Sequence, residues 1–134
     1  MNFKEIQKLI DDTDYWDSRV DSLECKYFSD EVSLKFKNAD CLVVCDFKEC
    51  YKVAFEHIKS YKKIAAIKNM TYTQIPYFLN EIIVEETFEQ GSKFLICKMN
   101  MFPLNVEIWC KDIDVYQESF GDQGKGSSGV QYIK

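Results

Sequence analysis

Alternation of apolar and polar residues between positions 23 and 57 constrains the fold of this chain more than any other feature. A period of two places the apolar side chains on one face of an extended strand. The pattern recurs in residues 23–27, 32–36, 41–47 and 51–57, with short polar turns between them. Because short turns join antiparallel neighbours, we expect these four segments to form a meander. Residues 41–47 are apolar on both faces, which predicts a central strand.

The second half of the chain returns to the strand pattern in residues 81–88, 94–101 and 106–115. Its best hairpin signal is Glu89-Gln90-Gly91-Ser92, in which Gly91 can supply a positive φ. Between the two halves, residues 59–68 fit either a helix or an irregular connection. Residues 69–80 predict a short helix or turn, with Thr73 as a cap.

The N-terminal segment, residues 2–11, predicts an amphipathic helix. Its apolar face is formed by Phe3, Ile6, Leu9 and Ile10, and Asn2 can cap its start. The predicted fold class is therefore α+β and mainly β. We expect an antiparallel meander or sandwich-like sheet of about seven strands with an N-terminal helix.

The chain has 134 residues, which is the size of one domain. Four of its five glycines and two serines lie in residues 121–129. This composition predicts a globular domain over residues 1–120 and a Gly/Ser-rich flexible tail over residues 121–134. Within the tail, residues 130–134 fit either a short docked strand or a disordered end.

Charge and hydropathy exclude several classes of partner. The formal net charge is −5, whereas binding a nucleic acid backbone requires a clustered basic surface. The longest apolar clusters, residues 41–45 and 64–67, are far shorter than the ~20 residues of a membrane span. The first residues do not resemble a secretion signal. We expect a cytoplasmic protein that binds neither nucleic acid nor membrane.

The six cysteines do not have the spacing of a metal site or a disulfide framework. They are Cys25, Cys41, Cys45, Cys50, Cys97 and Cys110, without a C-x-x-C pair. On a strand, Cys41 and Cys45 lie ~13 Å apart, too far to share a zinc ion. The aspartates of residues 11–21 lack the glycine and the terminal glutamate of a calcium loop. We expect small buried hydrophobic residues, no metal and no cofactor.

Evidence for an enzyme is weak. His57 is the only histidine, so its pairing with Cys25, Cys45 or Cys50 is the simplest nucleophile arrangement. No phosphate-binding or nucleophile-elbow motif is present. We therefore predict a protein without enzymatic activity. The alternative is a small-ligand-binding or enzymatic domain with a pocket lined by Tyr51, His57 and Trp109. A third hypothesis is a structural subunit of a larger assembly.

Acidic residues gather in two blocks. Residues 1–31 carry nine acids and four bases, for a net charge of −5, and residues 81–90 carry four acids and no base. Solvated faces often have such blocks, but together they also suit a basic protein partner. The candidate partner-binding residues are Asp11, Asp12, Asp14, Asp17, Glu81, Glu85, Glu86 and Glu89.

The stretch between the helix and the first strand carries two candidate structural residues. Trp16 and Val20 have the opposite parity to Leu23, which predicts a β-bulge near Asp21. We expect Trp16 to seat the helix on the sheet. Arg19 is the only arginine, and its position two residues from Asp17 and from Asp21 predicts an ion pair rather than a ligand contact.

Several short segments resemble small bacterial immunity proteins of polymorphic toxin systems. In these proteins a short helix leads into a strand that starts with a W-[H/D]-D-S-like motif, and a β meander follows. The matching segments here are WDSRV at residues 16–20, QIPYFLNEI at residues 74–82 and EIWCKDI at residues 107–113. The resemblance implies a non-enzymatic protein that binds and neutralises a cognate toxin.

Overall fold

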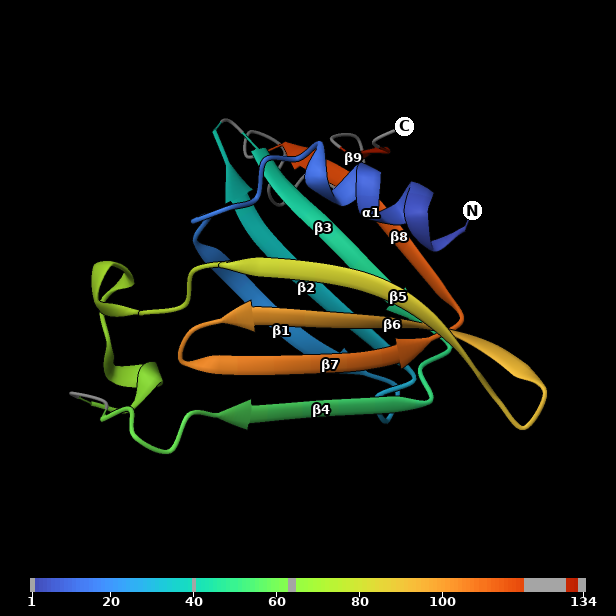
Figure 1. The fold of residues 1–134 in the computed structure, drawn as a ribbon. Coiled ribbons are helices and arrows are strands. Elements are labelled where there is room, and N and C mark those ends of the chain that lie inside the picture. Colours follow the sequence, from blue (N-terminus) through green and yellow to red (C-terminus); the bar gives the residue numbers. More distant parts are fainter. Residues whose placement is uncertain (1, 40, 63–64, 120–129, 133–134) are drawn as a thin grey trace.

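The computed structural model describes residues 2–39, 41–62, 65–119 and 130–132. It contains two antiparallel sheets packed face to face, with one helix at an edge (Figure 1). The helix is α1 (Phe3–Asp11), and two 3-10 turns are η1 (Ile67–Asn69) and η2 (Tyr72–Gln74). The prediction of a mainly β, antiparallel, sandwich-like fold with an N-terminal helix is confirmed.

The five-stranded sheet has the order β1 (Val20–Lys26), β2 (Glu31–Asn38), β3 (Cys41–Lys48), β8 (Asp112–Ser119) and β9 (Val130–Tyr132). The four-stranded sheet has the order β4 (Lys52–His57), β7 (Leu104–Cys110), β6 (Ser92–Met101) and β5 (Glu81–Glu89). Most of the predicted tail lies outside the described residues, but Val130–Tyr132 pairs with β8.

The predicted four-stranded meander is correct for three strands and wrong for the fourth. Strands β1, β2 and β3 are neighbours, and β3 lies centrally between β2 and β8, as expected. Strand β4 instead crosses to the other sheet and pairs with β7. The chain turns at Glu49, which has a φ of 52°. Alternation reports which face of a strand is buried but not its partner, so it could not detect this crossing.

The remaining local predictions are mostly confirmed. Asn2 and Glu5 form a capping box at the start of α1, and Ile6 and Ile10 are buried. The register of β1 shifts between Val20 and Ser22, which is the expected bulge. Gly91 has a φ of 81° in the β5–β6 turn. The cap of η2 is Thr71 rather than Thr73, because the turn begins two residues earlier than predicted.

Residues 59–68, for which a helix and an irregular connection were both open, are mostly irregular in their described part, and residues 106–115 depart from the prediction. The former include one 3-10 turn that begins at Ile67, with residues 63 and 64 outside the described part. In the latter, the apolar positions change parity between Cys110 and Ile113, and the chain divides at Lys111 into β7 and β8 of different sheets. None of the helices in the described ranges is long and apolar enough to cross a bilayer.

The core lies between the sheets and contains half of the cysteines. Cys45, Cys97 and Cys110 are buried there, as predicted for small hydrophobic residues, and all six thiols are free. Cys25 is exposed. It lies on β1, at the outer edge of the five-stranded sheet, where no further strand of that sheet covers it.

Helix α1 and the residue Tyr15 cover the free edge of β5. The Gln7 amide donates to the Ile82 carbonyl (2.9 Å) and accepts from the Val84 N–H (2.6 Å). The Tyr15 hydroxyl accepts from the Ile82 N–H (2.8 Å) and donates to its carbonyl (3.3 Å). Tyr15 therefore seats the helix on the sheet, whereas Trp16 is 48% exposed. This role was predicted for Trp16, whereas the adjacent residue Tyr15 makes these contacts.

Replacing Tyr15 by Phe should lower the free energy of unfolding by about 1–3 kcal/mol, because the buried Ile82 N–H loses its acceptor. Urea denaturation of the two proteins measures the difference. Tyr27→Phe is the matched control, since Tyr27 is 71% exposed and should unfold like the wild type. Equal stability of Tyr15→Phe and wild type would contradict this role of the hydroxyl.

Candidate functional site

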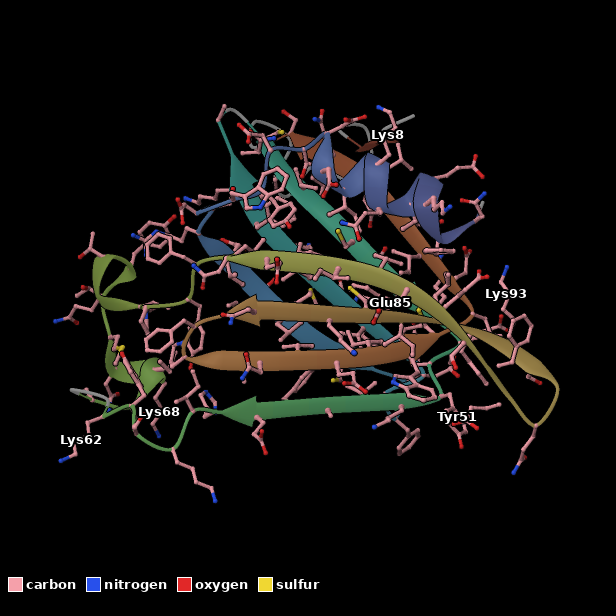
Figure 2. All side chains as sticks on the ribbon, viewed as in Figure 1. Lys8, Tyr51, Lys62, Lys68, Glu85 and Lys93 are labelled. Atoms are coloured by element: carbon pink, nitrogen blue, oxygen red, sulfur yellow. The ribbon has the colours of Figure 1, made fainter. Side chains whose placement is uncertain are left out.

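The outward face of the four-stranded sheet carries exposed polar side chains in rows across the strands. Pairing places Glu81 of β5 opposite Asn100 of β6, Asn100 opposite Asn105 of β7, and Asn105 opposite Glu56 of β4. All four are exposed. We call this set the polar row. Figure 2 looks onto the four-stranded sheet, with Glu85 and Tyr51 labelled.

A second row lies beside the polar row, two residues away from it along each strand. It consists of Ala54, Glu107, Lys98 and Ile83, in order from β4 to β5. The two rows line an open hollow of about 670 Å³. Ala54 leaves space on this surface because its side chain is a single methyl group. The hollow therefore crosses all four strands, from β4 to β5.

An aromatic cluster lies further along the strands, past the second row, and none of its three residues lines the hollow. Tyr51 stacks on Phe94 (ring centroids 4.9 Å apart) and lies 6.2 Å from Trp109, measured between ring centroids. The Trp109 indole donates to Glu107 (2.8 Å). This hydrogen bond, with help from Lys52, lowers the pKa of Glu107. Glu107 is thus a fixed carboxylate with partners of its own, and Tyr51 remains 64% exposed.

Residues 11–17, at and after the end of α1, lie against the start of β5, and we call them the acidic loop. The Asp17 N–H donates to the Leu79 carbonyl (2.7 Å), two residues before Glu81. Asp14 and Asp17 have φ values of 54° and 63°, in the left-handed region. Between them, Trp16 stacks on Tyr15 with ring centroids 4.3 Å apart. The structure thus places a half-exposed tryptophan among acidic residues next to one end of the polar row.

The eight predicted partner-binding carboxylates do not form a single patch. Asp11 accepts from Gln7, and Asp12 pairs with Lys8 (2.8 Å), so the loop acids with the fewest contacts are Asp14 and Asp17. Within the described part of the chain, Asp14, Asp17, Glu81 and Glu89 have no side-chain hydrogen bond or ion pair.

The other acids of β5 lie apart from Glu81. Glu85 shares its outward face and pairs with Lys98 (3.3 Å). Glu86 has the opposite parity and pairs with Lys93 (3.5 Å). Glu89 lies at the hairpin, about 26 Å along the strand from Glu81 at ~3.3 Å per residue. The structure therefore brings the acidic loop together with Glu81, and leaves Glu86 and Glu89 elsewhere.

Arg19 has different partners from the predicted aspartates. Its guanidinium donates to the carbonyls of Tyr72 (3.0 Å) and Ile75 (3.1 Å) and lies 4.6 Å from the centroids of the Tyr72 and Phe78 rings. In the described residues it forms no ion pair. Asp17 lies before β1 and has a positive φ, and the register shift between Val20 and Ser22 interrupts the strand face that Arg19 and Asp21 were expected to share. Arg19 therefore holds the loop before β5, as a structural residue.

The alternative pocket is not assembled in this structure. His57 lies at the far end of β4 from Tyr51, about 20 Å away at ~3.3 Å per residue, and contacts the Tyr77 hydroxyl (2.8 Å). Burial raises the pKa of Cys45 to about 12 and that of Cys50 to about 11. Both therefore remain neutral thiols near pH 7. Among the described residues, no group of three histidine, cysteine or acidic side chains can hold a metal ion.

Sequence reasoning missed the polar row. The outward parity of Ala54 and Glu56 was visible in the alternation of residues 51–57, and Asn100 and Asn105 were visible as polar positions. The pairing of β4 with β7, which brings these residues into line, was not predicted from the sequence. A prediction of the sheet order would have found the row.

Arg19→Lys should lower the free energy of unfolding by about 1–2 kcal/mol, since lysine lacks the planar fork that reaches two carbonyls between two rings. Hydrogen exchange should also accelerate in residues 72–78 and remain unchanged in β3. Lys26→Ala, which changes an exposed basic residue at the far end of β1, is the control. Unchanged exchange in residues 72–78 would contradict this anchoring role.

Thiol labelling tests the cysteine assignments. At pH 8, iodoacetamide should modify Cys25 first, because it is exposed, and should leave Cys45 and Cys110 unmodified, because burial raises the pKa of both to about 12. Mass spectrometry of peptides locates the modification. In urea all six should react. Rapid labelling of Cys45 in the native protein would indicate an accessible thiolate and would support the hypothesis that Cys45 is a nucleophile.

Comparison with known families agrees with the resemblance found in the sequence. The family model described as Immunity protein PIM7 matches residues 2–117, from the start of α1 into β8. Comparison with curated proteins gives no match. Because the family match covers far more than half of the chain, this protein belongs to the Immunity protein PIM7 family.

Proposed function

We propose that this immunity protein binds a basic cognate toxin domain in the cytoplasm and neutralises it by covering its surface, without a catalytic step. The observation that carries the proposal is the acidic loop beside β5. There, Asp14, Asp17 and Glu81 have no partner among the described side chains, and Trp16 is 48% exposed between the two aspartates. Tryptophan is among the residues most enriched at interface hot spots.

The charge of the chain supports the same proposal. A net charge of −5 creates a field that attracts a basic partner and accelerates its association. Asp11, Asp12 and Glu85 add to this field, although each already has a protein partner. The proposal extends to Glu86 and Glu89 only through long-range attraction, since they lie away from the loop.

The test is binding to the cognate toxin domain, purified with an inactivating substitution. Asp14→Asn/Asp17→Asn/Glu81→Gln should weaken binding about tenfold at low salt, at ~0.5 kcal/mol per charge. Surface plasmon resonance should show most of the loss in the association rate. The difference should shrink as salt is raised.

A second triple variant, Glu24→Gln/Asp30→Asn/Glu49→Gln, is the matched control. It also removes three exposed negative charges, and these lie outside the acidic loop. Equal weakening in both variants would mean that only net charge matters and would refute the acidic loop as the site. If the wild-type protein neither bound the toxin domain nor protected cells that express it, the proposed function itself would be wrong.

A further inference from the structure

We propose that the hollow on the outward face of the four-stranded sheet seats a basic segment of the toxin, laid across the strands along the polar row. This inference rests on the proposed function and assigns it a second contact surface. The hollow has about 670 Å³, and its lining comes from β4, β5, β6 and β7.

The charges of the hollow decide what it can hold. Lys98 is paired with Glu85 (3.3 Å), and Glu107 is paired with Lys52 (3.4 Å) and Trp109, so these groups are neutralised locally. Glu56 and Glu81, in contrast, have no hydrogen bond or ion pair from any described side chain. The surface therefore presents an unpaired carboxylate at each end of the polar row, which suits cations and repels nucleic acid.

The spacing of the row matches an extended peptide. Glu56 and Glu81 are separated by three strand-to-strand steps of ~4.8 Å, or about 14 Å. Two side chains four residues apart on one face of an extended segment lie ~13 Å apart. Between the carboxylates, Asn105 offers its amide group to the backbone of such a segment. Asn100 offers its amide N–H groups, since its amide oxygen already accepts from the Phe102 N–H (3.1 Å). A segment with two arginines or lysines at this spacing would therefore contact all four residues of the polar row.

The lining of the hollow itself provides the apolar contact that such a segment needs. Ile83 of β5 is 40% exposed and Phe55 of β4 is 42% exposed, and both line the hollow. Exposed aromatic residues are enriched among the anchors of protein interfaces.

The first experiment measures affinity for the inactivated toxin domain with two variants of β4. Ala54→Trp fills the hollow at an exposed position, and Glu56→Lys reverses one end of the row. Each should weaken binding at least tenfold. Ala66→Trp and Glu24→Lys make the same changes at exposed sites elsewhere and should bind like the wild type. Circular dichroism and urea denaturation check that every variant is folded.

The outcomes separate this inference from the proposed function. If the wild type binds the toxin domain and Ala54→Trp and Glu56→Lys bind equally well, the hollow is not a contact surface, although the protein is still an immunity protein. If the wild type sediments as a dimer that Ala54→Trp dissociates, the hollow holds a second copy of this chain, and the inference is overturned.

A second experiment does not need the toxin. The peptide acetyl-Arg-Ala-Ala-Ala-Arg-amide is titrated into ¹⁵N-labelled protein and followed by NMR. Amide shifts should change at Ala54, Glu56, Asn105 and Glu81, and Glu56→Gln/Glu81→Gln should abolish these changes. The peptide with glutamates in place of its arginines should give none. Shifts spread evenly over all acidic residues would overturn the inference.

Discussion

The contact on which the rest of the structure depends is the closure of the β5 edge by side chains of the N-terminal segment. Gln7 and Tyr15 together satisfy three backbone groups of Ile82 and Val84. An open edge would leave these groups to pair with another chain. Burial raises the pKa of the Tyr15 hydroxyl, with Asp11 and Glu81 adding to the shift. The phenol therefore remains a neutral donor and acceptor across the physiological range.

The same closure positions both parts of the candidate interface. Because Tyr15 is fixed on β5, the acidic loop that contains it must lie at the start of that strand, beside Glu81. Glu81 is in turn one end of the polar row, which crosses the sheet to Glu56. The acidic loop and the hollow are thus adjacent parts of one surface. A toxin that reaches both would contact the unpaired carboxylates of the acidic loop, of β5 and of β4.

Much of this could be predicted from the sequence, because local patterns carry it. The capping box at Asn2, the central position of β3, the bulge near Asp21 and the turn at Gly91 all follow from residue type and parity over a few positions. The partners of individual side chains could not be predicted in the same way. Arg19 binds carbonyls and rings from residues 72–78, more than fifty positions away, rather than the nearby aspartates.

The sequence by itself determined the class of the fold, the strands and turns, the acidic character and the resemblance to immunity proteins. These properties depend on periodicity, composition and short motifs, each of which is complete within a short segment. Only the tertiary structure decided that β4 joins the second sheet and that Tyr15, not Trp16, seats the helix. It also decided that Glu56 and Glu81 lie in one row. The physical reason is that strand pairing and edge closure depend on which distant backbone groups meet, and alternation reports only which face is buried.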